Sequence, residues 1–186
     1  EAIREAKPTR LYIAADGARE DKDGEAEKVT SVRDYVMENM DWDCEVKTLF
    51  REENLECKYA VSGAIDWFFD NEEMGIILED DCLPSQSFFW FCEELLERYK
   101  DDLQVGQISG DNFQNGIKRG GADYYFSVYA HIWGWASWAN RWKNYDVELD
   151  TINDINFIKN LFQNKNTQSY WLKIFRNMKM KKIDTW

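Results

Sequence analysis

The feature that most constrains the fold is the alternation of short apolar segments with longer amphipathic segments over the first 110 residues. Runs rich in apolar and β-branched side chains predict strands, here at residues 11–15, 44–50, 74–78 and 105–109. The amphipathic segments between them predict helices at residues 24–39, 58–70 and 88–99. Strands separated by helices in such short steps indicate an α/β domain with a mainly parallel sheet and helices on both faces. We therefore expect the strands at 11–15, 74–78 and 105–109 to be parallel neighbours.

The second half of the chain has a less regular pattern. Residues 115–123 read as a Gly-rich loop, residues 124–129 as a strand, and the aromatic segment 133–142 as helical at its end. From about residue 153 onward the pattern predicts two helices, divided near residues 164–166. Because there is no internal repeat or linker, we predict one domain over residues 1–186. Both ends break off within a pattern, so we expect a segment of a longer protein.

The balance of charged residues excludes several classes of partner. The formal net charge is −12, whereas nucleic acid and an anionic membrane surface both require basic patches. A cation that carries a phosphate remains compatible with this charge. The four cysteines form no Cys-x-x-Cys pair, and the single histidine, His131, excludes a multi-histidine metal site. With no membrane-spanning run and no signal-peptide pattern, we expect a cytoplasmic location, leaving peripheral association with the inner face of the membrane open.

Acidic residues follow two of the predicted strands directly. Asp16 comes after residues 11–15, and Glu79-Asp80-Asp81 comes after residues 74–78, with Pro84 shortly beyond. Ligands in parallel α/β sheets bind beyond the carboxyl ends of the strands. Three consecutive carboxylates repel one another, and Mg²⁺ or Mn²⁺ would offset this repulsion while neutralising a diphosphate. From the residues alone, solvated loop acids or helix-capping acids are equally good alternatives.

The residues around this acidic cluster resemble a known enzyme family. The segment 76–91, Ile-Ile-Leu-Glu-Asp-Asp-Cys-Leu-Pro-Ser-Gln-Ser-Phe-Phe-Trp-Phe, resembles the Glu-Asp-Asp segment of the N-acetylglucosaminyltransferase I group of GT-A glycosyltransferases. Residues 12–17, 107–112 and 132–135 are similar to further segments of that group, in the same order. The chain also resembles uncharacterised bacterial GT-A-like proteins associated with surface polysaccharides. The resemblance implies a Rossmann-like GT-A fold, as in nucleotide-diphospho-sugar transferases.

The resemblance also implies a role for individual residues. It assigns Asp81 to the metal, Glu79 and Asp80 to the ribose and donor sugar, and Asp16 to the uracil. Lys58 is a candidate for the nucleotide, although an exposed helix lysine is an equal alternative. The acceptor side would comprise Asp111, Asn112, Trp133 and Trp135. Asp111 and Asn112 also suit a plain turn after a strand, and most of the nine tryptophans are expected in the core.

The resemblance assigns no residue of this sequence to the catalytic base. In the family it lies just after a tryptophan, and this sequence reaches Trp186 at its end. We therefore expect the base beyond Trp186, with Asp184 as the alternative, and the first strand of the family before residue 1. Cys82 lies beside the acids, and nearby carboxylates would raise its pKa, which excludes it as a nucleophile. His131 is either a sugar or phosphate contact or a structural histidine.

Together these patterns predict a metal-dependent glycosyltransferase. It would use Mn²⁺ or Mg²⁺ to transfer a hexose or N-acetylhexosamine from a UDP-sugar donor to a glycan acceptor, with inversion implied by the resemblance. One alternative is a non-catalytic nucleotide- or cation-binding module of a larger polysaccharide-assembly protein. Another is an enzyme like the sugar-nucleotide pyrophosphorylases, but the chain has no Gly-rich basic signature for that class.

Overall fold

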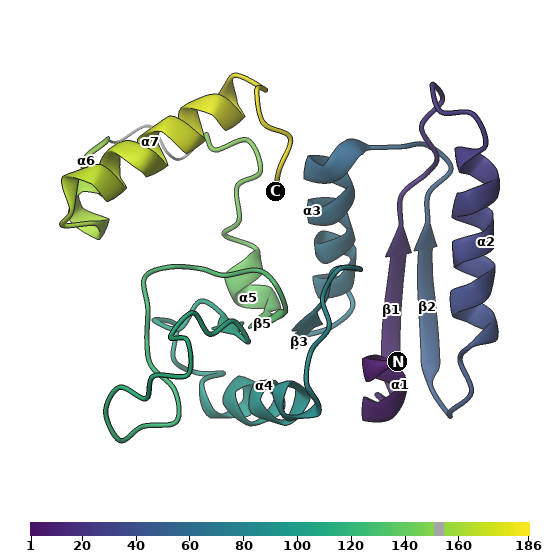
Figure 1. The fold of residues 1–186 in the computed structure, drawn as a ribbon, viewed down its shortest axis with the longest axis horizontal. Coiled ribbons are helices and arrows are strands. Elements are labelled where there is room, and N and C mark those ends of the chain that lie inside the picture. The colour runs from purple at the N-terminus through teal and green to yellow at the C-terminus, as the bar shows by residue number, and fades with distance from the viewer. Residues whose placement is uncertain (151–154) are drawn as a thin grey trace. The chain divides into compact units, whose positions relative to one another are not determined.

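The computed structural model describes residues 1–150 and 155–186 and has a mixed α/β architecture (Figure 1). Its strands are β1 (Arg10–Ala15), β2 (Glu45–Phe50), β3 (Met74–Ile77), β4 (Ile108–Ser109) and β5 (Trp135–Trp138). Its helices are α1 (Ala2–Ala6), α2 (Glu25–Glu38), α3 (Glu56–Phe69), α4 (Gln86–Arg98), α5 (Ala139–Trp142), α6 (Ile155–Leu161) and α7 (Lys165–Lys179). No helix in the described ranges is both long enough and apolar enough to cross a bilayer.

The chain divides into two compact units, each with its own sheet. We call residues 1–7 and 68–144 the antiparallel unit, and residues 8–67 and 145–186 the parallel unit. All predicted strands and helices of the first 110 residues are confirmed, with ends that differ by a few residues. The two predicted C-terminal helices are confirmed as α6 and α7, and the expected start near residue 153 lies outside the described residues.

In the parallel unit, β1 and β2 pair side by side over their whole lengths, from Arg10 opposite Glu45 to Ala15 opposite Phe50. The ring of Trp67 in α3 packs edge-on against Tyr12, with 5.1 Å between centroids, and the Arg33 guanidinium of α2 lies 5.0 Å from the Phe50 ring. In this register Tyr12 and Phe50 point to opposite faces. Helices α2 and α3 therefore cover the two faces of the pair, as predicted (Figure 1).

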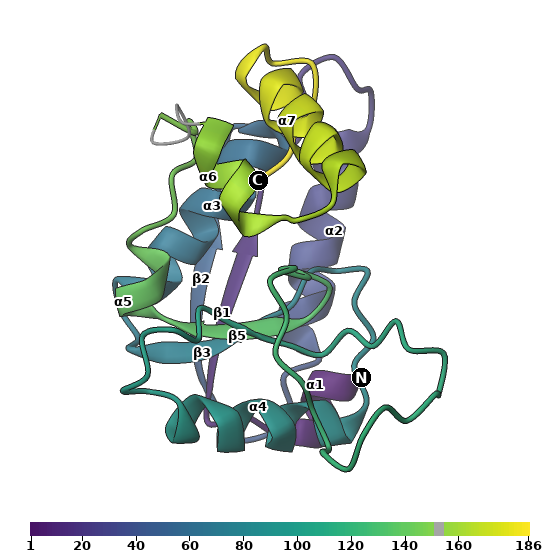
Figure 2. The ribbon, with the colours of Figure 1, turned by 90° about the vertical axis from the view of Figure 1, so that its left-hand side faces the viewer.

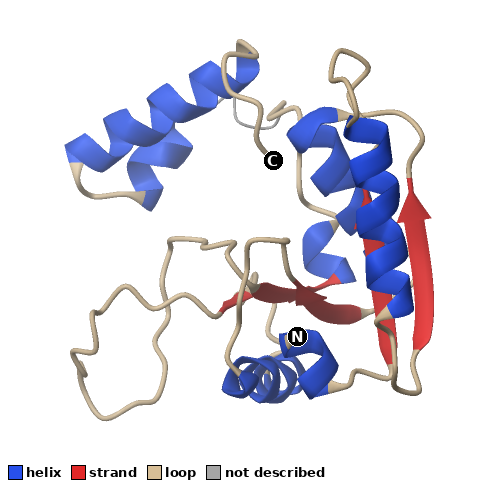
Figure 3. Cartoon of the chain, turned by 45° about the vertical axis from the view of Figure 1, so that its right-hand side comes forward, coloured by secondary structure: helices blue, strands red, loops and turns tan. Residues whose placement is uncertain are grey.

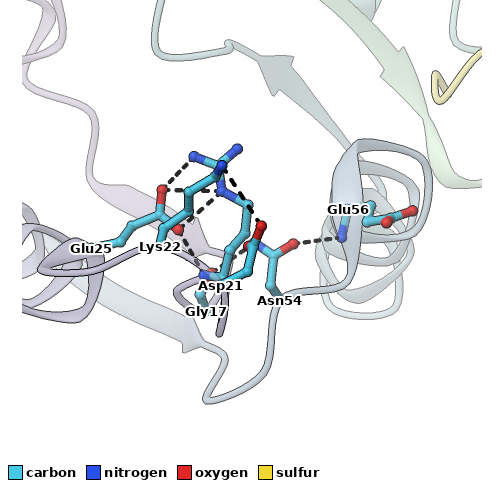
Figure 4. A network of polar contacts seen from close by, with 7 residues as sticks. Gly17, Asp21, Lys22, Glu25, Asn54 and Glu56 are labelled. Atoms are coloured by element: carbon cyan, nitrogen blue, oxygen red, sulfur yellow. Dashed lines mark hydrogen bonds and ion pairs between the residues drawn. The ribbon is translucent and has the colours of Figure 1, made fainter.

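The carboxyl ends of β1 and β2 are tied together by a polar network (Figure 4). The Gly17 amide donates to the Glu53 carbonyl at 3.1 Å, and Asn54 Nδ2 donates to the Gly17 carbonyl at 2.8 Å. A Cβ at Gly17 would lie 2.4 Å from the Glu52 carbonyl oxygen, so the two loops approach too closely for any side chain there. Next to this contact, hydrogen bonds from Arg19 lower the pKa of Glu25 to about 2.

The antiparallel unit contains a three-stranded sheet in the order β3-β5-β4. Strand β5 lies in the middle and runs antiparallel to both neighbours, as Figure 2 shows for β3. The prediction that residues 74–78 and 105–109 are parallel neighbours is therefore wrong, and β1 pairs with β2 in a separate sheet. Because β3 and β4 both oppose β5, they run in the same direction, and their carboxyl ends meet at one edge.

Two aromatic segments of the second half were misinterpreted: one contains the unpredicted strand β5, and the other was predicted as a strand but is a loop. Segment 133–142 is helical at its end, as predicted, because α5 covers Ala139–Trp142. The helical spacing of Trp135, Trp138 and Trp142 nevertheless concealed β5, since all four residues of this strand are buried and show no alternation of apolar and polar side chains. The predicted strand at residues 124–129 is wrong as well, because this segment is a loop. There the Tyr124 hydroxyl lies 2.7 Å from the Tyr99 hydroxyl. Side-chain contacts of this kind fix the position of the loop, in place of the backbone hydrogen bonds of the predicted strand.

Helix α4 forms the core of the antiparallel unit by packing one face on the sheet. Its residues Phe88, Cys92, Leu95 and Leu96 recur at helical spacing and are buried. They meet the strand side chains Ile108, Ala136 and Trp138. Because this helix begins directly after the acidic loop, its packing also determines where that loop lies.

Candidate functional site

A pocket of about 470 Å³ opens in the antiparallel unit, at the edge where β3 and β4 end. It is formed by the loop after β3, the start of α4, and both ends of the β4–β5 loop. Its lining residues are Leu78, Asp81, Cys82, Leu83, Pro84, Ser85, Phe88, Gly110, Asp111, Trp133 and Gly134. The volume lies in the range of small-molecule sites, and the lining combines apolar side chains with two carboxylates.

Of the three consecutive acids, only Asp81 reaches the pocket. A turn follows β3, in which the Cys82 amide donates to the Glu79 carbonyl at 3.0 Å. Glu79 is half-buried and Asp80 is exposed, and neither lines the cavity. Burial raises the pKa of the Cys82 thiol, and the neighbouring Asp81 carboxylate raises it further. The expectation that Cys82 is no nucleophile at neutral pH therefore agrees with its surroundings.

Asp111 enters the pocket from the other side because the ends of the β4–β5 loop are drawn together. The Gly110 amide donates to the Gly134 carbonyl at 3.0 Å, and the Asp111 amide donates to Ser109 Oγ at 3.2 Å. The Phe88 ring packs so closely that a Cβ at Gly110 would lie 2.5 Å from its Cδ2 atom. Gly134 has a φ of 86°, which favours glycine. The two carboxylates thus line one cavity from two different loops.

One aromatic residue of the long loop between β4 and β5, Trp133, lines the pocket and contacts a second aromatic ring of the same loop. This loop is drawn in tan in Figure 3. Trp133 lines the pocket and is 64% exposed, and the Phe113 ring lies 6.2 Å from it and 4.8 Å from the His131 ring. The His131 carbonyl accepts from Gln107 Nε2 at 2.9 Å, which anchors this part of the loop. Trp133 therefore presents an accessible ring beside the carboxylates.

Two predicted acceptor-side residues are not in this position. Trp135 is 3% exposed, does not line the pocket, and packs on Trp142 with 6.0 Å between ring centroids, so the structure lends its acceptor-side assignment no support. Asn112 is exposed, does not line the pocket, and accepts from the Gln114 amide at 2.9 Å. This contact matches the turn interpretation of Asn112.

The remaining candidates, Asp16 and Lys58, belong to the parallel unit. Asp16 Oδ2 accepts from the Leu55 amide at 2.8 Å, whereas its buried Oδ1 has no hydrogen-bond partner in the part of the chain that the structure describes. The alternative interpretation of Lys58 as an exposed helix lysine does not agree with its burial. Its side chain is 14% exposed, and Nζ lies 3.1 Å from Glu148 Oε2. Burial lowers the pKa of Lys58, but the contact with Glu148 outweighs this effect and the pKa is raised.

Asp184 has a structural contact in the parallel unit. Its two carboxylate oxygens accept from the Cys57 and Lys58 amides, at 2.8 Å and 3.0 Å, in the first turn of α3. The residue before this helix, Leu55, has no side-chain oxygen that could satisfy these amides. A carboxylate also favours the positive end of the helix dipole. Asp184 thus caps α3 from a position 126 residues further along the chain than Lys58.

We predict that Asp184→Ala destabilises the protein by about 0.5–2 kcal/mol, the usual cost of removing a helix cap. Chemical denaturation followed by far-UV circular dichroism would measure this loss. Asp184→Asn is the matched control, because it keeps one acceptor oxygen, and it should lose less. Equal stability of the alanine variant and the unmodified protein would contradict the capping role.

A comparison of the chain with family models, with curated proteins and with solved structures found no match.

The pocket suits a cation that is shared with a ligand. Among the described residues, no group of three or more His, Cys, Asp or Glu side chains could hold a metal ion by itself. Mg²⁺ and related ions commonly take only one or two protein carboxylates and complete their coordination with water and substrate phosphates. Asp81 is exposed, so its oxygens are accessible for such a contact. Asp81 and Asp111 supply carboxylate oxygens to the lining, which is the donor type that Mg²⁺ and Mn²⁺ prefer.

Sequence reasoning missed the residues that shape the cavity. Phe88 was recognised only as part of a helix, and Gly110 and Gly134 only as loop residues. Their combined role depends on a packing contact between segments that are distant in sequence. One pattern in the sequence could have indicated their role: Gly110 directly precedes Asp111 after a predicted strand, and Gly134 directly follows Trp133.

Proposed function

We propose that this chain is the catalytic part of a metal-dependent glycosyltransferase of the GT-A type. It would transfer a hexose or N-acetylhexosamine from a UDP-sugar donor to a glycan acceptor. The observation that carries the proposal is that Asp81 and Asp111 line the same pocket, with the accessible Trp133 ring at its rim. Carboxylates are the usual protein ligands of cations that carry phosphates, and an exposed aromatic ring offers a flat apolar surface on which a sugar ring could pack.

Within this proposal the two carboxylates have different roles. Asp81 would hold the cation, which supplies Lewis-acid stabilisation of the departing diphosphate when it is bound. Asp111 would accept the proton of the attacking acceptor hydroxyl, because no other carboxylate among the described residues lines the pocket. Trp133 would support a sugar ring through its exposed face. Asp16 and Lys58 remain proposed contacts for the uracil and the nucleotide, and Glu79 and Asp80 for the ribose and donor sugar.

The metal role of Asp81 can be tested by nucleotide binding. We expect UDP to bind more tightly with Mn²⁺ than with a chelator, and Asp81→Asn to remove most of this difference, since a hydrogen bond or contact to a charged group contributes about 1.5–3 kcal/mol. Isothermal titration calorimetry of UDP against each protein, with and without Mn²⁺, measures this quantity.

Asp101→Asn is the matched control for this titration. Asp101 is exposed in the same unit and lies outside the pocket, so its substitution should leave the effect of Mn²⁺ unchanged. Equal UDP affinity with and without Mn²⁺ in the unmodified protein would end the proposal of a metal-dependent transferase. Metal-dependent binding without turnover would instead favour the nucleotide-binding module.

A further inference from the structure

The charges of this protein are strongly segregated along the chain. The first 154 residues contain 16 basic and 34 acidic side chains, whereas residues 155–186 contain seven basic residues and one acid. Within residues 165–182 there are six basic residues and no acid at all. The net charge of −12 therefore conceals a basic segment at the C-terminal end of the sequence.

The basic residues of α7 form one row on the helix. Lys165, Lys173, Arg176 and Lys179 are all exposed, and at about 100° per residue they fall within roughly a third of the helix circumference. Two further exposed lysines, at positions 181 and 182, follow directly after the helix. Fifteen residues of helix extend about 22 Å, which exceeds the Debye length of about 8 Å at physiological salt. Acidic residues farther from the row than this length do not cancel its potential. Closer to it, Glu148 lies near enough to Lys181 for their charges to interact, and Asp184 follows two residues after Lys182.

The opposite side of α7 is apolar and packs against α6. Trp171 stacks on Phe162 at 6.1 Å between ring centroids, and Phe175 stacks on Trp171 at 5.6 Å. Asn164 caps the helix by accepting from the amides of residues 166 and 167. The helix therefore presents its cations from a packed hairpin. Large apolar side chains are also exposed on this hairpin and directly after it, namely Phe157, Leu161, Tyr170 and Met180.

We propose that α7 and residues 180–182 form a docking surface for an anionic lipid bilayer. Clusters of four to eight Lys and Arg residues on an amphipathic helix are typical of binding to anionic phospholipids. Exposed aromatic and apolar side chains next to such a cluster can enter the headgroup region. This surface contains none of the residues that line the carboxylate pocket.

The composition of the surface favours a bilayer over a nucleic acid. A nucleic-acid backbone would use the cations, but it would leave Tyr170 and Met180 in water unless unpaired bases were available for stacking. A bilayer uses both kinds of side chain, because the headgroups attract the lysines while the interface accepts the apolar groups. Because only the charges near the contact matter, the net charge of −12 does not exclude an anionic bilayer at this surface.

The test uses sedimentation with lipid vesicles. We expect the protein to bind vesicles of phosphatidylcholine that contain about a third phosphatidylglycerol, and not vesicles of phosphatidylcholine alone. Each basic residue near an anionic surface strengthens partitioning roughly fivefold. The variant Lys165→Gln, Lys173→Gln, Arg176→Gln and Lys179→Gln should therefore bind about a hundredfold more weakly or worse. The matched control removes four exposed cations elsewhere, Lys22→Gln, Lys28→Gln, Lys118→Gln and Arg119→Gln, and should bind normally.

A second variant separates the lipid from other polyanions. Tyr170→Ser with Met180→Ser should weaken binding to the anionic vesicles severalfold and leave any binding to duplex DNA unchanged. Far-UV circular dichroism of every variant controls for the folding of the hairpin. Failure to bind the anionic vesicles at low salt, equal binding by the four-residue variant, tighter binding to DNA than to vesicles, or vesicle binding that is insensitive to the serine substitutions would each overturn the proposal.

Discussion

Replacing Asp111 with asparagine is expected to lower sugar transfer by about 10²–10⁴-fold, the usual contribution of a general base, while Mn²⁺-dependent UDP binding is preserved. The reason is the division of roles in the pocket. If Asp81 holds the cation, Asp111 is the remaining carboxylate among the described lining residues. Asparagine has the same shape and can still contact Ser109 Oγ, but it cannot take up a proton. Release of UDP from a panel of UDP-sugars, with a mixture of acceptor glycans, measures this effect.

The neighbouring residue provides the control for this experiment. Asn112→Ala removes an exposed side chain that does not line the pocket, so it should leave turnover unchanged. If Asp111→Asn keeps the full rate, the base is another residue, and Asp111 has at most a positioning role. If the unmodified protein binds UDP with Mn²⁺ and releases none from any donor, the protein is a nucleotide-binding module and the transferase proposal fails.

Replacing Phe88 with alanine is expected to destabilise the protein by about 3–5 kcal/mol, as for other buried aromatic side chains. Phe88 is 8% exposed and belongs to the core of the antiparallel unit. Its ring packs against Gly110 and lies 3.6 Å from the position that a Cβ on Gly134 would take, so its loss removes the contact that holds both ends of the β4–β5 loop. Urea denaturation followed by tryptophan fluorescence measures the change in the free energy of unfolding.

Helix α4 contains a suitable control for Phe88→Ala. Trp90 is two residues further along and is 69% exposed, so Trp90→Ala should change the stability by only about 0.5 kcal/mol or less. A loss below about 1 kcal/mol for Phe88→Ala would show that the loop ends are held by their backbone contact alone. Weaker UDP binding by a folded Phe88→Leu variant would further support the role of this ring in shaping the pocket.

Local patterns were sufficient to locate most helices and strands. The apolar run before Glu79-Asp80-Asp81 predicted β3, and the apolar and β-branched residues at 44–50 predicted β2, because strands favour these side chains. The same rule failed for β5, whose two faces are both buried and whose tryptophans have helical spacing. It failed for residues 124–129 because aromatic residues in that loop pack on Tyr99 and Phe91.

The sequence by itself determined the mixed α/β character and the position of the acids after β3. These features depend on neighbouring residues and on periodicity, which the chain displays directly. Only the tertiary structure decided which acid reaches the pocket, that Asp111 joins Asp81 there, that Trp135 is buried, and that Asp184 caps α3. Each of these depends on contacts between residues far apart in the chain. The contacts at the pocket follow from the insertion of β5 between β3 and β4 and from the packing of Phe88. The Asp184 contact belongs to the parallel unit and follows from the return of the C-terminal segment to α3. No local period encodes either arrangement.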